Sequence, residues 1–287
     1  MNEIKALKKV ALVTGASSGI GRSTVLMLRD LGFITIATAP TLDEIAGLQG
    51  HGFETLQLDV TDESSMSEAV RAAEERYGAI DVLVNNAGLG QYGPIEEVPL
   101  AAVRHQFEVN VFGLIRMCQL VLPGMRRAGG GRIINVSSVA GEVAQPGGGI
   151  YHATKHAVEA IDATLRIEVS PFNIDVVGIL PGPVATHFED YARAHIPETG
   201  TESPYAAFKE NLKQTTRRMF EPGGPGVLEP EDVARVIVEA ATTTRPSTNY
   251  YVGMVSKVLS VLHAVTPVRM WDAAAKRMVP FEEKRTA

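Results

Sequence analysis

Short apolar runs alternate along the chain with stretches in which apolar residues recur at helical spacing. The apolar runs predict buried strands at residues 10–13, 34–37, 54–58, 82–84, 132–136, 175–180 and 250–252. Helices are expected to begin near Ile20, Leu42, Glu63, Leu100, Ile150 and Glu231. Strands and helices that alternate in this way build a doubly wound α/β fold, so we expect a mainly parallel, seven-stranded sheet with helices on both faces.

The alternation is interrupted only once, between residues 183 and 228, where a mixed helical pattern ends in the sequence EPGGPGVLEP. No linker rich in proline, serine or charge separates the chain into independent halves. We therefore expect one domain at residues 1–255, into which 183–228 is inserted, and a helical extension of the same domain at 256–287.

Charge and cysteine content narrow the function classes. The net charge of -6 and the pI near 5.7 argue against a nucleic-acid partner, because nucleic-acid binders usually carry a basic stripe. Cys118 is the single cysteine, which excludes an intramolecular disulfide and favours a reducing compartment. The amino terminus lacks a signal-peptide pattern and no apolar run could span a bilayer, so we expect a cytoplasmic protein without an integral membrane segment.

A glycine-rich turn lies between the first predicted strand and the first helix. Residues 14–21 read TGASSGIG, which places Gly15, Gly19 and Gly21 in the turn. Glycine lets the backbone approach a pyrophosphate, and the N–H groups and positive dipole end of the helix favour an anion. Taken alone, the motif also fits a purely structural turn.

A second loop follows the fourth predicted strand. Residues 85–88 read NNAG and come shortly after Asp81. Ligands of open α/β sheets bind at the carboxyl ends of the strands, where Ala87 and Gly88 would let a cofactor ring pass close. Asn85 and Asn86 could hold the loop or a neighbouring strand by side-chain hydrogen bonds. A structural Asn-Gly turn is the alternative for this segment alone.

A tyrosine, a lysine and a serine carry the strongest chemical signal. Tyr151 and Lys155 are four residues apart at the start of a helix, so their side chains share a face. A nearby ammonium favours the phenolate form of a tyrosine, and Ser138, at the end of the fifth strand, could donate to a carbonyl oxygen. Asn110, in the long fourth helix, could fix a water beside Lys155. A solvated helix face is the alternative for the Tyr-Lys pair by itself.

These motifs together resemble the short-chain dehydrogenase/reductase family. The resemblance rests on TGASSGIG, NNAG, Asn110, Ser138, the YHATK of residues 151–155 and the PG of residues 181–182, and it covers about residues 8–255. It implies a Rossmann-type fold in which 1–255 is a dinucleotide-binding catalytic domain and 183–228 a substrate lid. The sequence around residues 156–186 looks most like the hydroxysteroid and retinol dehydrogenase branch.

The resemblance also implies roles for individual residues. Tyr151 would be the acid/base, Ser138 would polarise the carbonyl, Lys155 would hold the nicotinamide ribose and Asn110 would complete a proton relay. Asp59 would meet the adenine, Asn86 and Gly88 the adenosine ribose, and Val184 and Thr186 the carboxamide. The full set of residues expected to contact the dinucleotide is Gly15, Ser17, Ser18, Gly19, Ile20, Gly21, Ala39, Asp59, Val60, Asn86, Ala87, Gly88, Tyr151, Lys155, Pro181, Gly182, Val184 and Thr186.

The choice between NAD and NADP is less determined. Members that prefer NAD place an acidic residue after the second strand, where this chain has Ala39, and many NADP users place arginine where it has Pro40. The missing carboxylate permits a 2'-phosphate, which Thr38 or Thr41 could bind, so the sequence favours NADP and leaves NAD open. Ser18 stands where some NADP users carry a basic residue, which weakens this preference.

The resulting hypothesis is an NAD(P)-dependent oxidoreductase that interconverts a hydrophobic ketone or aldehyde and a secondary or primary alcohol. The alternative is a catalytically inactive NAD(P)-sensing regulator with the same fold. An epimerase or dehydratase that uses the same Tyr and Lys is a third option. The histidines lack ligand spacing, so no metal site is expected. Homodimers and homotetramers are common among the relatives, and we expect one of these assemblies.

The carboxyl-terminal segment combines an apolar face with a basic end. Val255, Val258, Leu259 and Leu262 recur at helical spacing, and Arg269, Lys276 and Arg277 follow. This pattern favours packing onto the domain or onto a partner subunit. A peripheral membrane contact is the alternative.

Overall fold

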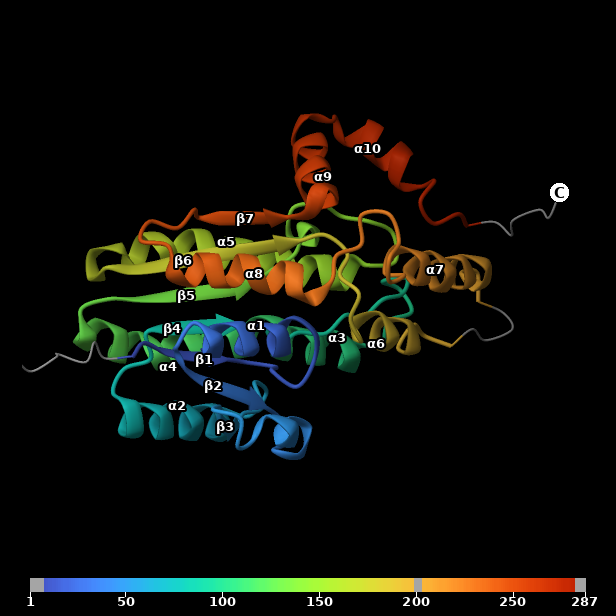
Figure 1. Cartoon of the computed structure of the whole chain (residues 1–287). Coiled ribbons are helices and arrows are strands. Elements are labelled where there is room, and N and C mark those ends of the chain that lie inside the picture. Colours follow the sequence, from blue (N-terminus) through green and yellow to red (C-terminus); the bar gives the residue numbers. More distant parts are fainter. Residues whose placement is uncertain (1–7, 199–202, 282–287) are drawn as a thin grey trace, which may run out of the picture.

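Seven parallel strands form the centre of the protein in the computed structural model, which describes residues 8–198 and 203–281 (Figure 1). The strand order is β3-β2-β1-β4-β5-β6-β7, and every neighbouring pair is parallel. The predicted sheet is therefore confirmed. The terminal parts of the predicted domain, 1–7 and 282–287, and residues 199–202 of the predicted lid lie outside the described residues.

The strands agree closely with the apolar runs of the sequence. Their bounds are β1 (Val10–Val13), β2 (Ile34–Ala39), β3 (Glu54–Gln57), β4 (Val82–Asn85), β5 (Gly131–Val136), β6 (Ile174–Pro181) and β7 (Asn249–Val252). The register pairs Val13 of β1 with Val84 of β4, and Asn85 of β4 with Asn135 of β5. The carboxyl ends of the central strands consequently lie side by side, which is where a ligand of such a sheet binds.

Five of the six predicted helix starts coincide within one residue with the start of an α-helix. They are α1 (Gly19–Asp30), α2 (Glu63–Tyr77), α3 (Leu100–Phe107), α4 (Gly113–Ala128), α5 (Gly149–Val169), α6 (Phe188–Ala194), α7 (Ala206–Met219), α8 (Pro230–Thr242), α9 (Gly253–Val265) and α10 (Val268–Ala275). The predicted helix near Leu42 is a short 3-10 helix, η1 (Asp43–Leu48). A π-helical turn, η2 (Glu108–Phe112), joins α3 to α4, so the predicted long fourth helix contains an irregular turn.

Capping residues explain two of the helix starts. The Asp62 carboxylate accepts hydrogen bonds from the N–H groups of Ser64 and Ser65, which satisfies two free donors of α2. At α8, Glu229 and Asp232 form a reciprocal capping box, with Pro230 in the first turn. Both helices begin within one residue of the predicted starts near Glu63 and Glu231, so both predictions are confirmed.

Helices cover both faces of the sheet with separate apolar cores. On one face, α1 and α8 pack with residues such as Val25 and Ile237 against the sheet. On the other, α2, α4 and α5 contribute Met66, Met117 and Val158. Because strands buried on both faces need apolar residues throughout, the continuous apolar runs of the sequence have a direct structural cause.

The interruption at residues 183–228 forms a separate layer beside the carboxyl edge of the sheet. Its two ends are joined by a bridge between Val184 and Leu228. Between them, α6 and α7 contribute Ala192, Phe208 and Leu212 to a third apolar cluster, which also contains Tyr151 of α5. The inserted segment is thus packed against the end of the sheet at which the glycine-rich turn lies (Figure 1).

The carboxyl-terminal helices depart from the expected packing. Val255 and Leu259 of α9 are half-buried, but Val258 and Leu262 are exposed, so only part of the predicted apolar face covers the domain. Figure 1 shows α9 and α10 projecting beyond β7, the edge strand. Within the described residues, no helix is both long and apolar enough to cross a membrane.

Gly21 provides a test of how α1 is positioned. A Cβ atom at this position would lie 2.2 Å from the Gly15 carbonyl oxygen and 2.6 Å from Asn86 Nδ2. Gly21→Ala should therefore displace the glycine-rich turn and lower the free energy of unfolding by about 1–3 kcal/mol, measured by urea denaturation. Gly47→Ala is the control, because no atom lies within 4 Å of its added Cβ. Equal stability of Gly21→Ala and the unchanged protein would contradict this account.

Candidate active site

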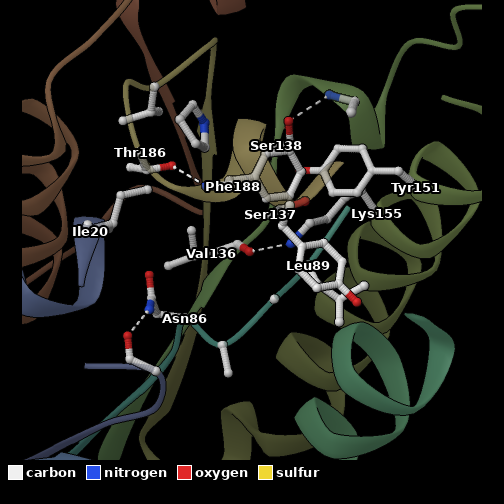
Figure 2. Close-up of a pocket in the computed structure, with 18 of the residues that line it drawn as sticks. Ile20, Asn86, Leu89, Val136, Ser137, Ser138, Tyr151, Lys155, Thr186 and Phe188 are labelled. Carbon is white, nitrogen blue, oxygen red and sulfur yellow. Dashed lines mark hydrogen bonds between the residues drawn. The ribbon is translucent and has the colours of Figure 1, made fainter. Parts of the chain in front are cut away.

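A cavity of about 740 Å³ opens at the carboxyl ends of β1, β4, β5 and β6. Its wall is formed by the loops that follow these strands, at residues 15–20, 86–89, 137–140 and 181–184. Residues of the inserted segment and of α9 complete it, among them Phe188 and Leu259. The cavity is thus built at the edge of the sheet that the sequence indicates (Figure 2).

The glycine-rich turn has the backbone shape that a pyrophosphate cradle needs. Gly15 and Gly19 adopt φ angles of 65° and 52°, which favour glycine. A Cβ at Gly19 would lie 3.0 Å from Thr186 Cγ2, so glycine also lets the loop after β6 cross the turn. Ser18 precedes α1 without a side-chain cap, which leaves the first N–H groups of the helix available to an anion. The turn therefore fits a dinucleotide pyrophosphate.

Asparagines hold the loops around this turn, as predicted. Asn86 Nδ2 donates to the carbonyl oxygens of Thr14 and Gly15 at 2.9 and 3.0 Å. Asn85 Nδ2 donates to Asn135 Oδ1 at 2.9 Å and so links β4 to β5. These bonds fix the NNAG loop against the glycine-rich turn.

Ser138, Tyr151 and Lys155 converge on the same cavity (Figure 2). The Ser138 hydroxyl lies close enough to the Tyr151 phenol to favour its ionised form, and it accepts a hydrogen bond from the Ala140 N–H at 3.1 Å. The Lys155 Nζ lies 5.9 Å from the centre of the Tyr151 ring and donates to the Val136 carbonyl oxygen at 2.8 Å. Ser138 lies two residues beyond β5 and caps a short 3-10 helix, rather than ending the strand itself. The predicted constellation is therefore present in space.

Burial sets the titration of both groups. It raises the pKa of Tyr151 to about 12, and the neighbouring Ser138 hydroxyl opposes this shift. It lowers the pKa of Lys155 to about 8, against the attraction of Glu159 and Asp162. The expected lowering of the tyrosine pKa by Lys155 is therefore absent in the ligand-free protein, because desolvation of the phenol dominates. At neutral pH the pair consists of a neutral phenol and an ammonium.

Asn110 lies in the π-helical turn and is buried. Its Oδ1 accepts from the Leu89 N–H at 2.9 Å, and its Nδ2 donates to the Leu89 carbonyl oxygen at 2.9 Å and to Thr154 Oγ1 at 3.1 Å. The side chain therefore holds the loop after β4 against α5. The relay water beside Lys155 stays a prediction.

Most of the residues predicted to contact a dinucleotide line the cavity. These are Gly15, Ser17, Ser18, Gly19, Ile20, Asp59, Val60, Asn86, Ala87, Gly88, Tyr151, Lys155, Pro181, Gly182, Val184 and Thr186. Three predicted site residues do not reach its wall. Gly21 packs α1 against the glycine-rich turn, and Ala39 is fully buried in the core. Asn110 is hydrogen-bonded to the backbone of Leu89.

The wall on the β2 and β3 side differs from the expected 2'-phosphate site. Thr38 is fully buried and donates to the Val13 carbonyl oxygen, so its proposed bond to a phosphate is wrong. Thr41 donates to the Glu44 carboxylate at 2.9 Å. Pro40, Glu44 and Asp59 line this part of the cavity. Glu44 was not among the predicted site residues, because this residue lies in η1 rather than directly after β2.

Aromatic side chains around Tyr151 were also missed. The Phe188 ring lies 5.1 Å and the Tyr92 ring 5.9 Å from the Tyr151 ring, centre to centre. His152 and His187 also line the cavity. Nothing in the local sequence distinguishes Tyr92 from a surface loop residue, because its role depends on the inserted segment folding over it.

Comparison with known proteins agrees with this geometry. The family model of short chain dehydrogenases matches residues 9–197. The probable short-chain type dehydrogenase/reductase VdlC of Helicobacter pylori is 33% identical, over 97% of this chain and 100% of its own length. Human retinol dehydrogenase 8 is 34% identical, over 84% of this chain and 80% of its own length. The second relative is consistent with the branch that the sequence resembles.

Solved structures show the same fold with either cofactor. A short-chain dehydrogenase from Streptomyces avermitilis is 32% identical with a TM-score of 0.77, over 94% of this chain and 98% of its own. A serine dehydrogenase complexed with NADP+ is 27% identical (TM-score 0.74, 86% and 95% coverage). A short chain dehydrogenase/reductase from Burkholderia phymatum in complex with NAD is 25% identical (TM-score 0.76, 99% and 100% coverage). The chain belongs to the short-chain dehydrogenase/reductase family of NAD(P)-dependent oxidoreductases.

Proposed function

We propose that the protein interconverts a hydrophobic ketone or aldehyde and the corresponding alcohol, with Tyr151 as the acid/base. The observation that carries the proposal is the convergence of Ser138, Tyr151 and Lys155 on the wall of a cavity bordered by the glycine-rich turn. A nicotinamide dinucleotide bound there would supply or accept the hydride.

The neutral phenol suits the reductive direction. As negative charge develops on a carbonyl oxygen, Tyr151 can give it a proton and Ser138 can donate a second hydrogen bond. The Lys155 ammonium stabilises the phenolate that this step leaves behind. Lys155 would also hold the nicotinamide ribose, and the N–H groups at the start of α1 would hold the pyrophosphate. Residues 183–228 would act as the substrate lid of the catalytic domain.

The cavity wall supports an apolar substrate. Val139 and Val143 after β5, Phe188 of the inserted segment, Met219 of α7 and Leu259 of α9 all line it. Apolar side chains from three separate segments, the loop after β5, the inserted segment and α9, favour a ligand whose bulk is hydrocarbon. Retinol dehydrogenase 8, a relative, carries an apolar alcohol in its name, which is consistent with this substrate class.

We further propose that NAD(H) is preferred over NADP(H), in contrast to the expectation from sequence. The carboxylates of Glu44 and Asp59, which follow β2 and β3 in the chain, line one part of the cavity. Among the described lining residues, Lys155 is the only lysine, and none is an arginine. A 2'-phosphate would meet negative charge there without a cation to bind it. We also propose that the protein is located in the cytoplasm, where the thiol of Cys118 stays reduced. Its proposed assembly is a homodimer or a homotetramer.

A nucleotide sensor with the same fold is the competing function. A sensor needs the cradle but not a proton donor in contact with a carbonyl-polarising hydroxyl.

Tyr151→Phe separates the two functions. The variant should bind cofactor with unchanged affinity and lose about 10²–10⁴-fold in kcat, since only the proton donor is removed. Cofactor oxidation with a panel of hydrophobic ketones, followed by absorbance, measures the rate, and a fluorescence titration measures affinity. Tyr92→Phe, which removes a hydroxyl from the same cavity, should lose less than about tenfold. Cofactor binding without turnover in the unchanged protein would favour the sensor.

Lys155→Met should raise the stability of the ligand-free protein. The pKa of Lys155 is about 8 when folded, against an ordinary value of 10.5, so below pH 8 the folded protein holds a buried ammonium. Removing this charge should stabilise the fold, and losing the hydrogen bond to Val136 should offset part of that gain. The net increase in the free energy of unfolding at pH 7 should be about 1–3 kcal/mol. Between pH 8 and 10.5 the unfolded chain binds the extra proton, so the stability of the unchanged protein rises with pH and the difference narrows.

Urea denaturation at pH 7 and pH 10 checks this expectation. Lys257→Met, at an exposed lysine of α9, controls for the general effect of losing one positive charge. A Lys155→Met protein that is less stable than the unchanged protein at pH 7 would show that the buried ammonium stabilises the fold.

Pro40→Arg tests the cofactor preference. The unchanged protein should have a higher kcat/KM with NADH than with NADPH. An arginine on the cavity wall at residue 40 should raise kcat/KM for NADPH at least about tenfold, because a charge-assisted bond to the phosphate becomes available. Leu42→Arg places the same charge nearby but outside the cavity lining, and should have little effect. Equal or better use of NADPH by the unchanged protein would refute the preference.

A further inference from the structure

The last helices of the described chain turn an apolar stripe away from the protein. Met254, Val258, Val261 and Val265 of α9 follow the spacing of one helix face, and they are 71, 44, 64 and 72% exposed. Apolar stripes of helices normally face the core. This stripe faces outward, although Val255 and Leu259 of the same helix are half-buried and face the cavity.

Polar anchors fix the inner face of the same helix. The buried Ser256 hydroxyl donates to the Leu180 carbonyl oxygen at 2.6 Å, and the Ser260 hydroxyl donates to the Glu142 carboxylate. Val255 and Leu259, on the same side, line the cavity. The outward stripe is therefore a consequence of specific hydrogen bonds, and it adjoins the site described above.

The next helix extends this surface. Val268 and Met270 of α10 are 74 and 65% exposed. Trp271 holds α10 in place, because its Nε1 donates to the Ala144 carbonyl oxygen at 3.2 Å and its ring packs edge-on against His263. Nine of the sixteen exposed large hydrophobic side chains described for the molecule lie between residues 253 and 281. Figure 1 shows the two helices projecting from the body. We call their exposed large hydrophobic residues the apolar ridge: Met254, Val258, Val261, Leu262, Val265, Val268 and Met270.

The charge around the apolar ridge is opposite to that of the rest of the chain. Residues 253–281 contain Lys257, Arg269, Lys276 and Arg277 but only one acid, Asp272, and so carry +3 in a protein of net charge -6. All four basic residues are exposed. A second copy of this chain docked ridge to ridge would bring two positive surfaces together, which opposes association. The partner that fits is both apolar and negatively charged.

A lipid surface with anionic headgroups has both properties. We propose that the apolar ridge docks on an anionic membrane surface, with the stripe of α9 inserted among the lipids and the basic side chains at the headgroups. The acidic remainder of the protein then faces away from the membrane. Because the inner face of α9 lines the cavity, the membrane lies next to the substrate site.

Vesicle binding of the full chain tests the proposal without any substrate or cofactor. The protein should sediment with vesicles of phosphatidylcholine mixed with phosphatidylglycerol, and much less with phosphatidylcholine alone. Raising the salt concentration should weaken binding, because screening shortens the range of the headgroup attraction. No binding to the mixed vesicles would overturn the proposal, and so would equal binding to both kinds.

Paired variants locate the surface. Val261→Ser/Val265→Ser removes apolar area from the stripe and should reduce the bound fraction at least about tenfold in partition coefficient. Ile167→Ser is the matched control, because Ile167 is 75% exposed on α5, away from the apolar ridge. It should bind like the unchanged protein. Thermal unfolding of each variant confirms that it is folded, and binding that survives the double substitution would overturn the proposal.

Sedimentation equilibrium distinguishes the other occupant. If the apolar ridge is an interface between two copies, Val261→Ser/Val265→Ser will lower the oligomeric state in the absence of lipid, and the membrane proposal is then wrong. If the assembly state is unchanged while vesicle binding is lost, the apolar ridge binds lipid as proposed.

Discussion

Burial of the Lys155 amine is the constraint on which the rest of the site depends. Lys155, Glu159 and Asp162 lie on the side of α5 that faces the sheet, where a helix of this fold ordinarily places apolar residues. Each must find hydrogen bonds or charge partners in the core, because an unpaired buried charge is strongly destabilising. The fold supplies them from the sheet. Lys155 Nζ binds the Val136 carbonyl oxygen of β5, and Asp162 accepts from Asn135 Nδ2 at 2.5 Å.

These bonds connect the helix that carries Tyr151 to two strands. Asn135 accepts from Asn85 of β4, so α5, β5 and β4 share one buried polar network. Burial raises the pKa of Asp162 to about 7, which shows how poorly this environment solvates a charge. The bonds that the network makes tie α5 to both strands, although two of its buried carboxylate oxygens, Asp162 Oδ2 and Glu159 Oε1, have no hydrogen-bond partner among the described residues. The network therefore fixes the phenol relative to Ser138 more firmly than apolar packing alone would.

The sequence could predict those parts of the fold and site that depend on local pattern. The seven strands follow from apolar runs, and the starts of α2 and α8 follow from Asp62 and from Glu229 with Asp232. The sheet order then brings the glycine-rich turn, Ser138 and Tyr151 to one edge, because parallel strands all end on the same side. The placement of these groups was predictable without knowledge of any single contact.

What could not be predicted depends on contacts between distant segments. Glu44 reaches the cavity because η1 folds back over the end of β2, and Tyr92 meets Tyr151 under the inserted helices. The pKa of Tyr151 is another example: spacing along a helix shows that Lys155 is near, but only the packed structure shows that desolvation outweighs the ammonium. Asn110 likewise binds a loop 21 residues earlier in the chain.

Helix α9 illustrates the same limit in its simplest form. A period of 3.6 residues tells which side chains share a face, but it does not tell which face is turned toward the core. In α9 the short serines at 256 and 260 decide the orientation, because each finds an acceptor on the body of the protein and would lose it if the helix rotated. The Leu180 carbonyl oxygen would then lose its bond from Ser256, whereas the Glu142 carboxylate would keep its bond from the Tyr251 hydroxyl. The hydrogen bonds of Ser256 and Ser260 therefore help to keep Val258, Val261 and Val265 exposed to solvent, where a partner of matching chemistry can cover them.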